Sequence, residues 1–393
     1  MARTLTSWGD NTNGQLGDGA SAHRWTPQEL KGPENIATTD AGSGHAFALG
    51  IDGDLWGWGR NAFGQLADGT TENQNAPVRA TGLPGRVLKV GAGGGHTAAL
   101  LDDGTVWAWG AGFFCALGED EFGVQMQPLL VRGLEDVVDL AVGGAHNLAV
   151  KADGSVWSWG RDDRGQLGDG PDSEREGRIV RSYMSASFDC RPRPARVEGL
   201  EPAVAVAAGG GHSMVVHADG SLSAWGFNDR GQLGDGTFED RPAPQKVRGI
   251  PGVAQITGGY HHTVALMVDG TVWAWGLNDG GQLGDGTTQD RAEPRAVSGL
   301  SGVKSVSAHG GGTDAAPGNG GHNLALRSDG TVYGWGWNNY GQLAADPATA
   351  HVLTPRRLPL DRPALDVTAG GEIPVSNKFM ANPGGGFGLA LLG

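Results

Sequence analysis

Six histidines recur at one position of a repeated sequence pattern and are the first candidates for chemistry. Neutral imidazole is a common zinc ligand and general base. A repeat places one such histidine in each structural unit, however, and zinc needs all its ligands within about 2 Å. We therefore expect a structural role, with each imidazole hydrogen-bonded to neighbouring backbone, and we expect no metal and no cofactor. The six are His45, His96, His146, His212, His262 and His322.

A second set of ionisable residues stands outside the repeated pattern. In a pocket that excludes water, such groups can act as general acids and bases. Each one alone is more typical of a solvated loop, so the sequence leaves open whether the protein is an enzyme and leans against it. The set consists of Tyr260, His261, His309, Asp314, Glu372 and Lys378.

The familiar catalytic and metal-binding motifs are absent from the sequence. There is no G-x-S-x-G, no H-E-x-x-H, no Walker loop and no Cys-x-x-Cys pair. The recurring G-Q-L-G-D-G loops contain aspartate but lack the alternating carboxylates and the final glutamate of an EF-hand. We interpret these aspartates as turn-stabilising residues.

The element that must position all these residues is a long internal repeat, W-G-x-N-x-x-G-Q-L-G-D-G. Successive copies are 50 to 66 residues apart, and periods in this range indicate a propeller or a solenoid. The tryptophans that mark the copies are Trp8, Trp58, Trp109, Trp159, Trp225, Trp275 and Trp335.

Each period contains four short apolar runs, which we name strands A to D in chain order. An Asp-Gly pair such as Asp219-Gly220 separates strands B and C, and this pair is a strong hairpin signal because the tight turn needs positive φ. Each period is thus one four-stranded antiparallel blade, and seven blades make a closed ring. TLTSWG at the start is a strand C, and FGLALLG at the end is a strand B with Phe387 in place of histidine. We expect both termini to complete blade 1.

The G-H-x-x-A-L, D-G-x-V-W-x-W-G and N-x-x-G-Q-L-G elements resemble the regulator of chromosome condensation repeat family over nearly the whole chain. The resemblance implies an all-β, seven-bladed β-propeller, here a single domain of residues 1–393. The resemblance does not specify a function, because the family includes guanine-nucleotide exchange factors, protein inhibitors and scaffolds. The function must therefore be argued from the site.

Composition limits the partners and the location. The net charge of −14 disfavours nucleic acid as a partner, and the basic tail of the family's eukaryotic namesake is missing. No apolar run approaches the ~18 residues of a membrane span. The first strand begins close to Met1, so we expect a cytoplasmic monomer, secreted only if a leader was removed. Cys115 and Cys190 fall in different blades and imply no disulfide framework.

Function should lie where the copies differ. In an antiparallel meander the A–B and C–D loops share one face, the loop face, and the B–C and D–A loops share the other, the turn face. The B–C turns are uniform, so the turn face is expected to be scaffold. The long departures, roughly Pro171–Pro194, Ala308–His322 and Gly370–Gly386, all fall on the loop face.

Aromatic side chains at variable positions make the loop face an expected interaction surface, although several of them could instead pack against adjacent loops. The leading hypothesis is a binding module for a protein or peptide. The alternative is an enzyme acting on a small molecule at the channel mouth, and a weaker one is exchange on a small GTPase. The expected binding residues are Phe63, Phe113, Phe114, Arg178, Tyr183, Phe188, Phe227, Trp337, Tyr340 and Phe379.

Overall fold

The Asp-Gly pairs lie in tight turns between antiparallel strands, as the sequence predicts. The turn glycines have positive φ, for example 79° at Gly220 and 82° at Gly330, which a residue with a Cβ adopts only at a cost. In each pair the aspartate carboxylate accepts a hydrogen bond from the backbone N–H two residues later, as Asp219 does from Ser221 at 2.8 Å. The hairpin between strands B and C is therefore set by local chemistry in blades 2 to 7, where the two strands are consecutive in the chain.

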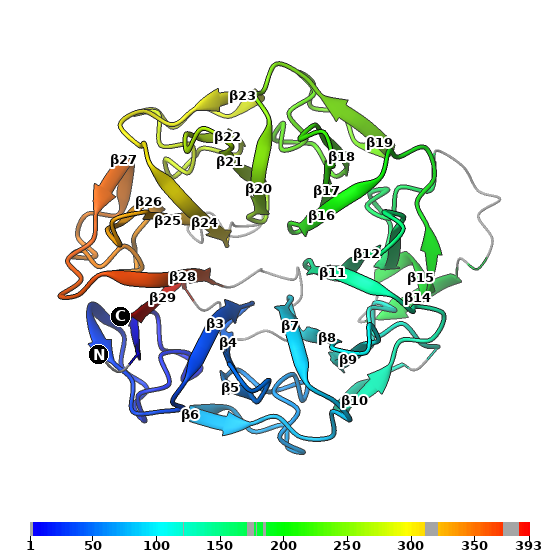
Figure 1. Ribbon diagram of the computed structural model, residues 1–393, viewed down its shortest axis with the longest axis horizontal. Coiled ribbons are helices and arrows are strands. Elements are labelled where there is room, and N and C mark those ends of the chain that lie inside the picture. Colours follow the sequence, from blue (N-terminus) through cyan, green and yellow to red (C-terminus); the bar gives the residue numbers. More distant parts are fainter. Residues whose placement is uncertain are drawn as a thin grey trace.

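The computed structural model describes residues 3–120, 122–170, 177, 179–183, 186–310, 321–371 and 385–393. Within these residues the chain forms strands and no helix, arranged as a ring of seven sheets (Figure 1). The innermost strands of the ring line a central channel. No helix in this part of the chain is long and apolar enough to cross a membrane. The predicted all-β, seven-bladed propeller is confirmed.

The strands of the first four blades follow the predicted order, with strand A innermost. Blade 1 contains β28 (Ala364–Gly370), β29 (Phe387–Leu392), β1 (Thr4–Gly9) and β2 (Arg24–Glu29). Blade 2 contains β3 (Ile36–Ala41), β4 (His45–Gly50), β5 (Leu55–Gly59) and β6 (Gln74–Arg79). Blade 3 contains β7 (Val87–Ala92), β8 (His96–Leu101), β9 (Val106–Ala111) and β10 (Val124–Leu130). Blade 4 contains β11 (Val137–Val142), β12 (His146–Lys151), β13 (Val156–Arg161), β15 (Ala186–Arg196) and an additional edge strand, β14 (Ile179–Tyr183).

The last three blades are four-stranded. Blade 5 contains β16 (Ala203–Ala208), β17 (His212–His217), β18 (Leu222–Gly226) and β19 (Arg241–Val247). Blade 6 contains β20 (Val253–Gly258), β21 (His262–Met267), β22 (Val272–Gly276) and β23 (Arg291–Ala296). Blade 7 contains β24 (Val303–His309), β25 (His322–Arg327), β26 (Val332–Trp337) and β27 (His351–Arg357).

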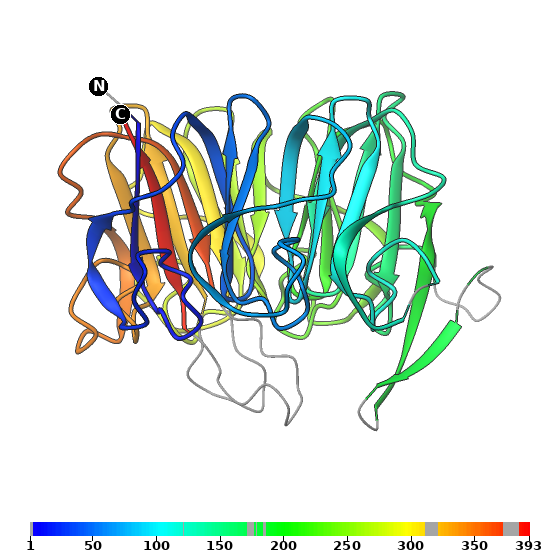
Figure 2. The same cartoon turned by 90° about the horizontal axis from the view of Figure 1, so that it is seen from below.

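Both ends of the chain complete blade 1, as the sequence predicts. β1 pairs antiparallel with β29, with Leu5 opposite Leu391, and β29 pairs with β28. The blade therefore joins the N-terminal and C-terminal segments in one sheet and closes the ring. Figure 2 shows both termini on the turn face, while the β14–β15 hairpin extends beyond the ring on the loop face.

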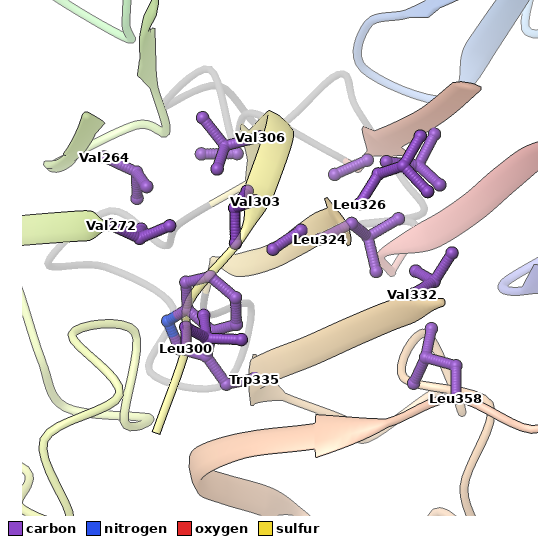
Figure 3. Close-up of a cluster of buried hydrophobic side chains, with 14 of the residues drawn as sticks. Val264, Val272, Leu300, Val303, Val306, Leu324, Leu326, Val332, Trp335 and Leu358 are labelled. Atoms are coloured by element: carbon purple, nitrogen blue, oxygen red, sulfur yellow. The ribbon is translucent and has the colours of Figure 1, made fainter. Parts of the chain in front are cut away.

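The repeated tryptophans hold each blade to the preceding one. All seven side chains are fully buried, and each indole Nε1 donates to a backbone carbonyl in the C–D loop of the preceding blade at 2.7–3.1 Å. Apolar side chains of blades 6 and 7 surround one of them, Trp335 (Figure 3). The acceptors, from blade 1 to blade 7, belong to Gln342, Gln15, Gln65, Ala116, Gln166, Gln232 and Gln282.

The repeated histidines make a second set of contacts between blades. Five of them bond through Nε2 to a side chain of the next blade rather than to backbone, as His262 does to Asn323 Oδ1 at 2.8 Å. The Nε2 of His322 instead bonds to a backbone partner of the expected kind, the carbonyl of Phe387 at 3.1 Å. Burial lowers the pKa of all six to about 3 or 4, so these side chains are neutral structural groups.

Candidate binding surface on the loop face

The C–D loops are fixed by their repeated residues, which leaves the variable positions free for function. In blade 5 the Asn228 Oδ1 accepts from the backbone N–H of Leu233 at 2.9 Å, and its Nδ2 donates to the Thr237 carbonyl at 3.1 Å. Gln232 Oε1 accepts from the backbone N–H of Arg230 at 2.9 Å. The Asn and Gln of the pattern therefore fix the loop.

Arginine and phenylalanine side chains on the loop face contact each other, both within one blade and between neighbouring blades. The closest pair is the Arg164 guanidinium over the Phe227 ring, 4.5 Å from its centroid, which joins blades 4 and 5. Three further pairs have separations of 5.4–5.5 Å. Such cation–π contacts hold both partners in place while leaving the aromatic edge available. The three are Arg60 with Phe63, Arg161 with Phe114, and Arg181 with Phe122.

Phenylalanine rings continue this surface across blades 2, 3 and 4. The ring centroids of Phe63 and Phe113 are 5.9 Å apart, and those of Phe113 and Phe122 are 5.4 Å apart, both edge to face. Phe114 lies 4.7 Å from Phe188. Phe122 is 45% exposed, and the Phe63, Phe113 and Phe114 side chains are half-buried. We name Phe63, Phe113, Phe114, Phe122 and Phe227, together with Arg60, Arg161, Arg164 and Arg181, the Arg–Phe surface; within it Arg60 is only 8% exposed.

The two cysteines are joined, contrary to the expectation from the sequence. Cys115, in the C–D loop of blade 3, forms a disulfide with Cys190 of β15, with their Cα atoms 6.0 Å apart. The long β15 strand crosses toward the blade 3 loop and brings the two residues together, which no spacing argument could show. The disulfide is buried beside Phe188 and Phe114, so it attaches the blade 4 insertion to the Arg–Phe surface.

The blade 4 insertion is partly structural. Its β14 and β15 form a hairpin, with Ile179 opposite Cys190. Phe188, expected to be an exposed binding residue, is only 5% exposed because it packs under Phe114. Arg191 is also buried, and it pairs with Asp169 at 3.0 Å. Of the other residues predicted here, Arg178 and the Tyr183 side chain lie outside the described residues.

The aromatic residues of blade 7 differ from the expectation of exposed side chains. Trp337 is 9% exposed and packs over Gly280, where any side chain would collide with the indole. Its ring also meets His351 at 4.4 Å. Trp337 is therefore a contact between blades, and its predicted role as an exposed aromatic is wrong. Tyr340 is half-buried and lies 5.6 Å from the His23 ring, while Phe379 lies outside the described residues.

Three of the six proposed acid–base residues can be placed, and they do not share one pocket. Tyr260 and His309 lie in the wall of the central channel, which encloses about 290 Å³. His261 does not line this channel; its ring lies between those of Tyr260, 4.4 Å away, and Phe227, 5.1 Å away, and its Nδ1 is 3.3 Å from Asp229 Oδ1. Asp314, Glu372 and Lys378 lie outside the described residues.

The two side chains in the channel wall, Tyr260 and His309, are uncharged at neutral pH. Burial lowers the pKa of His309 to about 4 and raises the pKa of Tyr260, so both are neutral near pH 7. Burial acts to raise the pKa of Asp229, but hydrogen bonds from His261 and Gln232 outweigh it and hold the pKa below its usual value. Among the described residues, no group of three His, Cys, Asp or Glu side chains gathers closely enough to hold a metal ion.

Five members of the Arg–Phe surface were not among the binding residues expected from the sequence, and they are Arg60, Phe122, Arg161, Arg164 and Arg181. Arg60 and Arg161 directly follow the W-G pair, and Arg164 is the last variable residue before G-Q. The signal was available, because these positions vary between copies just as those of the named phenylalanines do. Phe122 follows the degenerate loop of blade 3 and had no repeat partner to reveal it.

Comparisons with known proteins agree with this architecture. The family model of the RCC1-like domain matches residues 4–375 of this chain. The Ultraviolet-B receptor UVR8 of Arabidopsis thaliana is 33% identical over 319 residues, which cover 79% of this chain and 67% of the receptor. E3 ubiquitin-protein ligase HERC2 of Mus musculus is 31% identical over 241 residues, or 59% of this chain. The match spans only 5% of the length of HERC2.

Solved structures share the fold over the full ring. Prp20p from Saccharomyces cerevisiae, described with its binding properties to Gsp1p and histones, superimposes with a TM-score of 0.80 at 22% identity, covering 100% of this chain and 92% of that one. Human WBSCR16 gives 0.79 at 23% identity, covering 99% and 100%. At these identities the likeness establishes the fold alone.

Proposed function

This chain belongs to the RCC1-like domain family, and from that premise we propose that it is a protein-binding module whose loop face holds a protein or peptide partner. The observation that supports the proposal is the Arg–Phe surface. Four arginines lie against four phenylalanines at positions where the repeat itself dictates no residue. Arginine and aromatic side chains dominate the energetics of protein interfaces.

The physical character of this surface suits a protein partner. Its rings are held by neighbouring guanidinium groups and by the disulfide, so little side-chain freedom is lost on binding. Its arginines are themselves held, as in the two 2.7 Å contacts between Arg161 and Asp163. A partner therefore meets an ordered surface of rings and charges. The relatives give consistent support, since Prp20p is described as binding Gsp1p and histones.

The enzyme hypothesis has less support from the described residues. The His261 ring contacts that of Tyr260 at 4.4 Å, but its Nδ1 lies 3.3 Å from Asp229 and it is not among the residues of the channel wall that holds Tyr260 and His309. Nucleotide exchange on a small GTPase rests on the family alone. We therefore propose binding, and the test below would also reveal a GTPase as the captured partner.

The test is affinity capture from cells that express the chain, followed by direct binding measurements with the captured protein. Arg164→Ala and Phe122→Ala should each reduce the binding free energy for that partner by about 2 kcal/mol, or roughly 30-fold in affinity, as substitutions of interface anchors do. Val268→Ala, a matched change at a 72% exposed residue of the turn face, should leave the affinity unchanged. Equal affinity for all three variants would show that the Arg–Phe surface is not the binding site.

We also propose that the chain works in an oxidising compartment, rather than in the cytoplasm as the sequence alone suggested. The Cys115–Cys190 disulfide supports this, because disulfides persist mainly outside the reducing cytosol. Thiol titration of protein isolated without reductant tests it. No free thiol is expected before reduction, whereas two free thiols in the isolated protein would favour the cytoplasm.

A further inference from the structure

The turn face carries a ring of exposed side chains that the blade repeat does not require. In every blade, the register between strands A and B shifts between the first and third residues of strand A, as between Val137 and Asp139 in blade 4. A bulge leaves its extra residue unpaired and redirects the side chain. The seven residues at this position are all exposed, and they are Ala37, Leu88, Val138, Val204, Ala254, Lys304 and Leu365.

These residues surround the turn-face mouth of the channel. Each strand A begins beside the Asp-Gly turn of the preceding blade, as when the Val137 N–H donates to the Gly104 carbonyl at 3.1 Å. The channel wall itself begins one or two residues further along each strand, for example at Lys89 and Leu140. The bulge residues therefore lie at the entrance, above the wall.

The apolar residues at the mouth are not explained by packing. Leu88, Val138 and Val204, in three successive blades, are 48%, 55% and 55% exposed. Blade 7 carries Lys304 at the same position, so the fold accepts a charged side chain there. Exposed apolar groups that the fold does not need, gathered at one opening, are characteristic of an interaction site.

Carboxylates surround these three side chains. The cations near the Asp-Gly turns and D–A loops of blades 3 to 5 are fewer than the acidic residues, although Arg196 and Lys246 act on Asp153 and Asp219. The others in these turns and loops are Arg86 and Arg132, with Lys151 beside one turn. Side-chain and backbone hydrogen bonds from Ser155 lower the pKa of Asp153, and those from Ser221 lower the pKa of Asp219, so both are ionised. The acidic residues are Asp102, Asp103, Glu135, Asp136, Asp153, Glu198, Glu201 and Asp219.

We propose that the turn-face mouth over blades 3 to 5 is a second docking surface, which takes an extended protein segment whose apolar side chains are flanked by lysine or arginine. The apolar side chains of the segment contact Leu88, Val138 and Val204, and its cations face the surrounding carboxylates. A second copy of this chain is a poor occupant, because it would bring the same carboxylates face to face. The site lies on the face opposite the Arg–Phe surface, so either proposal can fail without the other.

The test uses a fluorescent synthetic peptide of alternating leucine and lysine with the full chain. Fluorescence anisotropy should show that the peptide binds the double variant Val138→Ser/Val204→Ser about tenfold more weakly, because apolar burial is lost. The double variant Glu135→Gln/Glu201→Gln should weaken binding by a comparable factor, because two carboxylates that face the lysines are removed. Val180→Ser, at a 69% exposed residue of the insertion hairpin, and Glu239→Gln on the loop face are the matched controls, and both should bind like the original chain.

Two results would overturn the proposal. One is an unchanged affinity in both mouth variants. The other is equally tight binding of a control peptide in which serine replaces leucine, because the attraction would then be charge alone. All variants change exposed side chains, and matching melting temperatures confirm that each ring is folded.

Discussion

The contacts between blades and the loop face follow opposite rules, although they lie a few residues apart in the chain. Between blades, each of the seven repeated indoles donates to a carbonyl of the preceding blade, and neutral histidines bond to the next one. On the loop face, the variable positions carry arginine in blade 4, phenylalanine in blade 3 and glycine in blade 6. Trp225 and Phe227 show the contrast across a single intervening residue, because Trp225 is fully buried and Phe227 is half-buried.

This difference separates stability from recognition. In a repeat ring, stability is close to the sum of the blade interiors and their nearest-neighbour contacts, and these contacts are the ones that recur. Residues that vary between copies are under no such requirement. This separation would be contradicted if a repeated contact proved dispensable for stability, or if a variable loop residue proved essential for folding.

The largest expected effect comes from removing residues Phe387–Gly393. Blade 1 then loses β29, which pairs with both β1 and β28, and two strand edges become exposed. We expect unfolding or self-association, visible by circular dichroism and size-exclusion chromatography. Phe387→His, which restores the residue of the other blades, should stay folded and serves as the control. A monomeric truncation with unchanged melting would contradict closure by the two termini.

Acid should destabilise the ring through the repeated histidines. Burial depresses their folded pKa to about 3 or 4, below the unfolded value of 6.5, so the stability that they contribute is present above pH 6.5 and is lost as pH falls. Each histidine should remove about 1.4 kcal/mol per pH unit below 6.5. Urea unfolding at pH 7.5, 6 and 5 measures this slope, and His262→Gln should reduce it. A flat profile would contradict buried neutral histidines.

Asp40 should have the opposite pH dependence. Burial in the channel wall raises its folded pKa to about 7, above the unfolded value of 3.8, so its contribution to stability is lost as pH rises through that window. Asp40→Asn keeps an oxygen to accept the Ala92 N–H but cannot ionise. The difference in unfolding free energy between the variant and the original chain should therefore be more favourable to the variant at pH 8 than at pH 5. An equal difference at both pH values would count against a protonated Asp40 in the channel wall.

The sequence predicts the interior far better than the surface. Periodic tryptophans, Asp-Gly turns and two incomplete end strands specify seven blades and their closure, because each signal acts locally and recurs. The Cys115–Cys190 disulfide was missed because it depends on the path of an insertion that has no second copy. Trp337 was assigned to the surface because its burial depends on Gly280 of another blade. Contacts made once, between distant segments, leave no periodic trace.

The most direct test of the separation between stability and recognition compares Trp225→Phe with Phe227→Ala, measuring unfolding free energy and partner affinity for both. Trp225→Phe removes the donor to the Gln166 carbonyl and should lower stability by about 1 to 3 kcal/mol with affinity unchanged. Phe227→Ala should change stability by less than about 0.5 kcal/mol and weaken the partner by about 2 kcal/mol. If Phe227→Ala instead lowers stability as much as Trp225→Phe and leaves the affinity intact, the account is wrong.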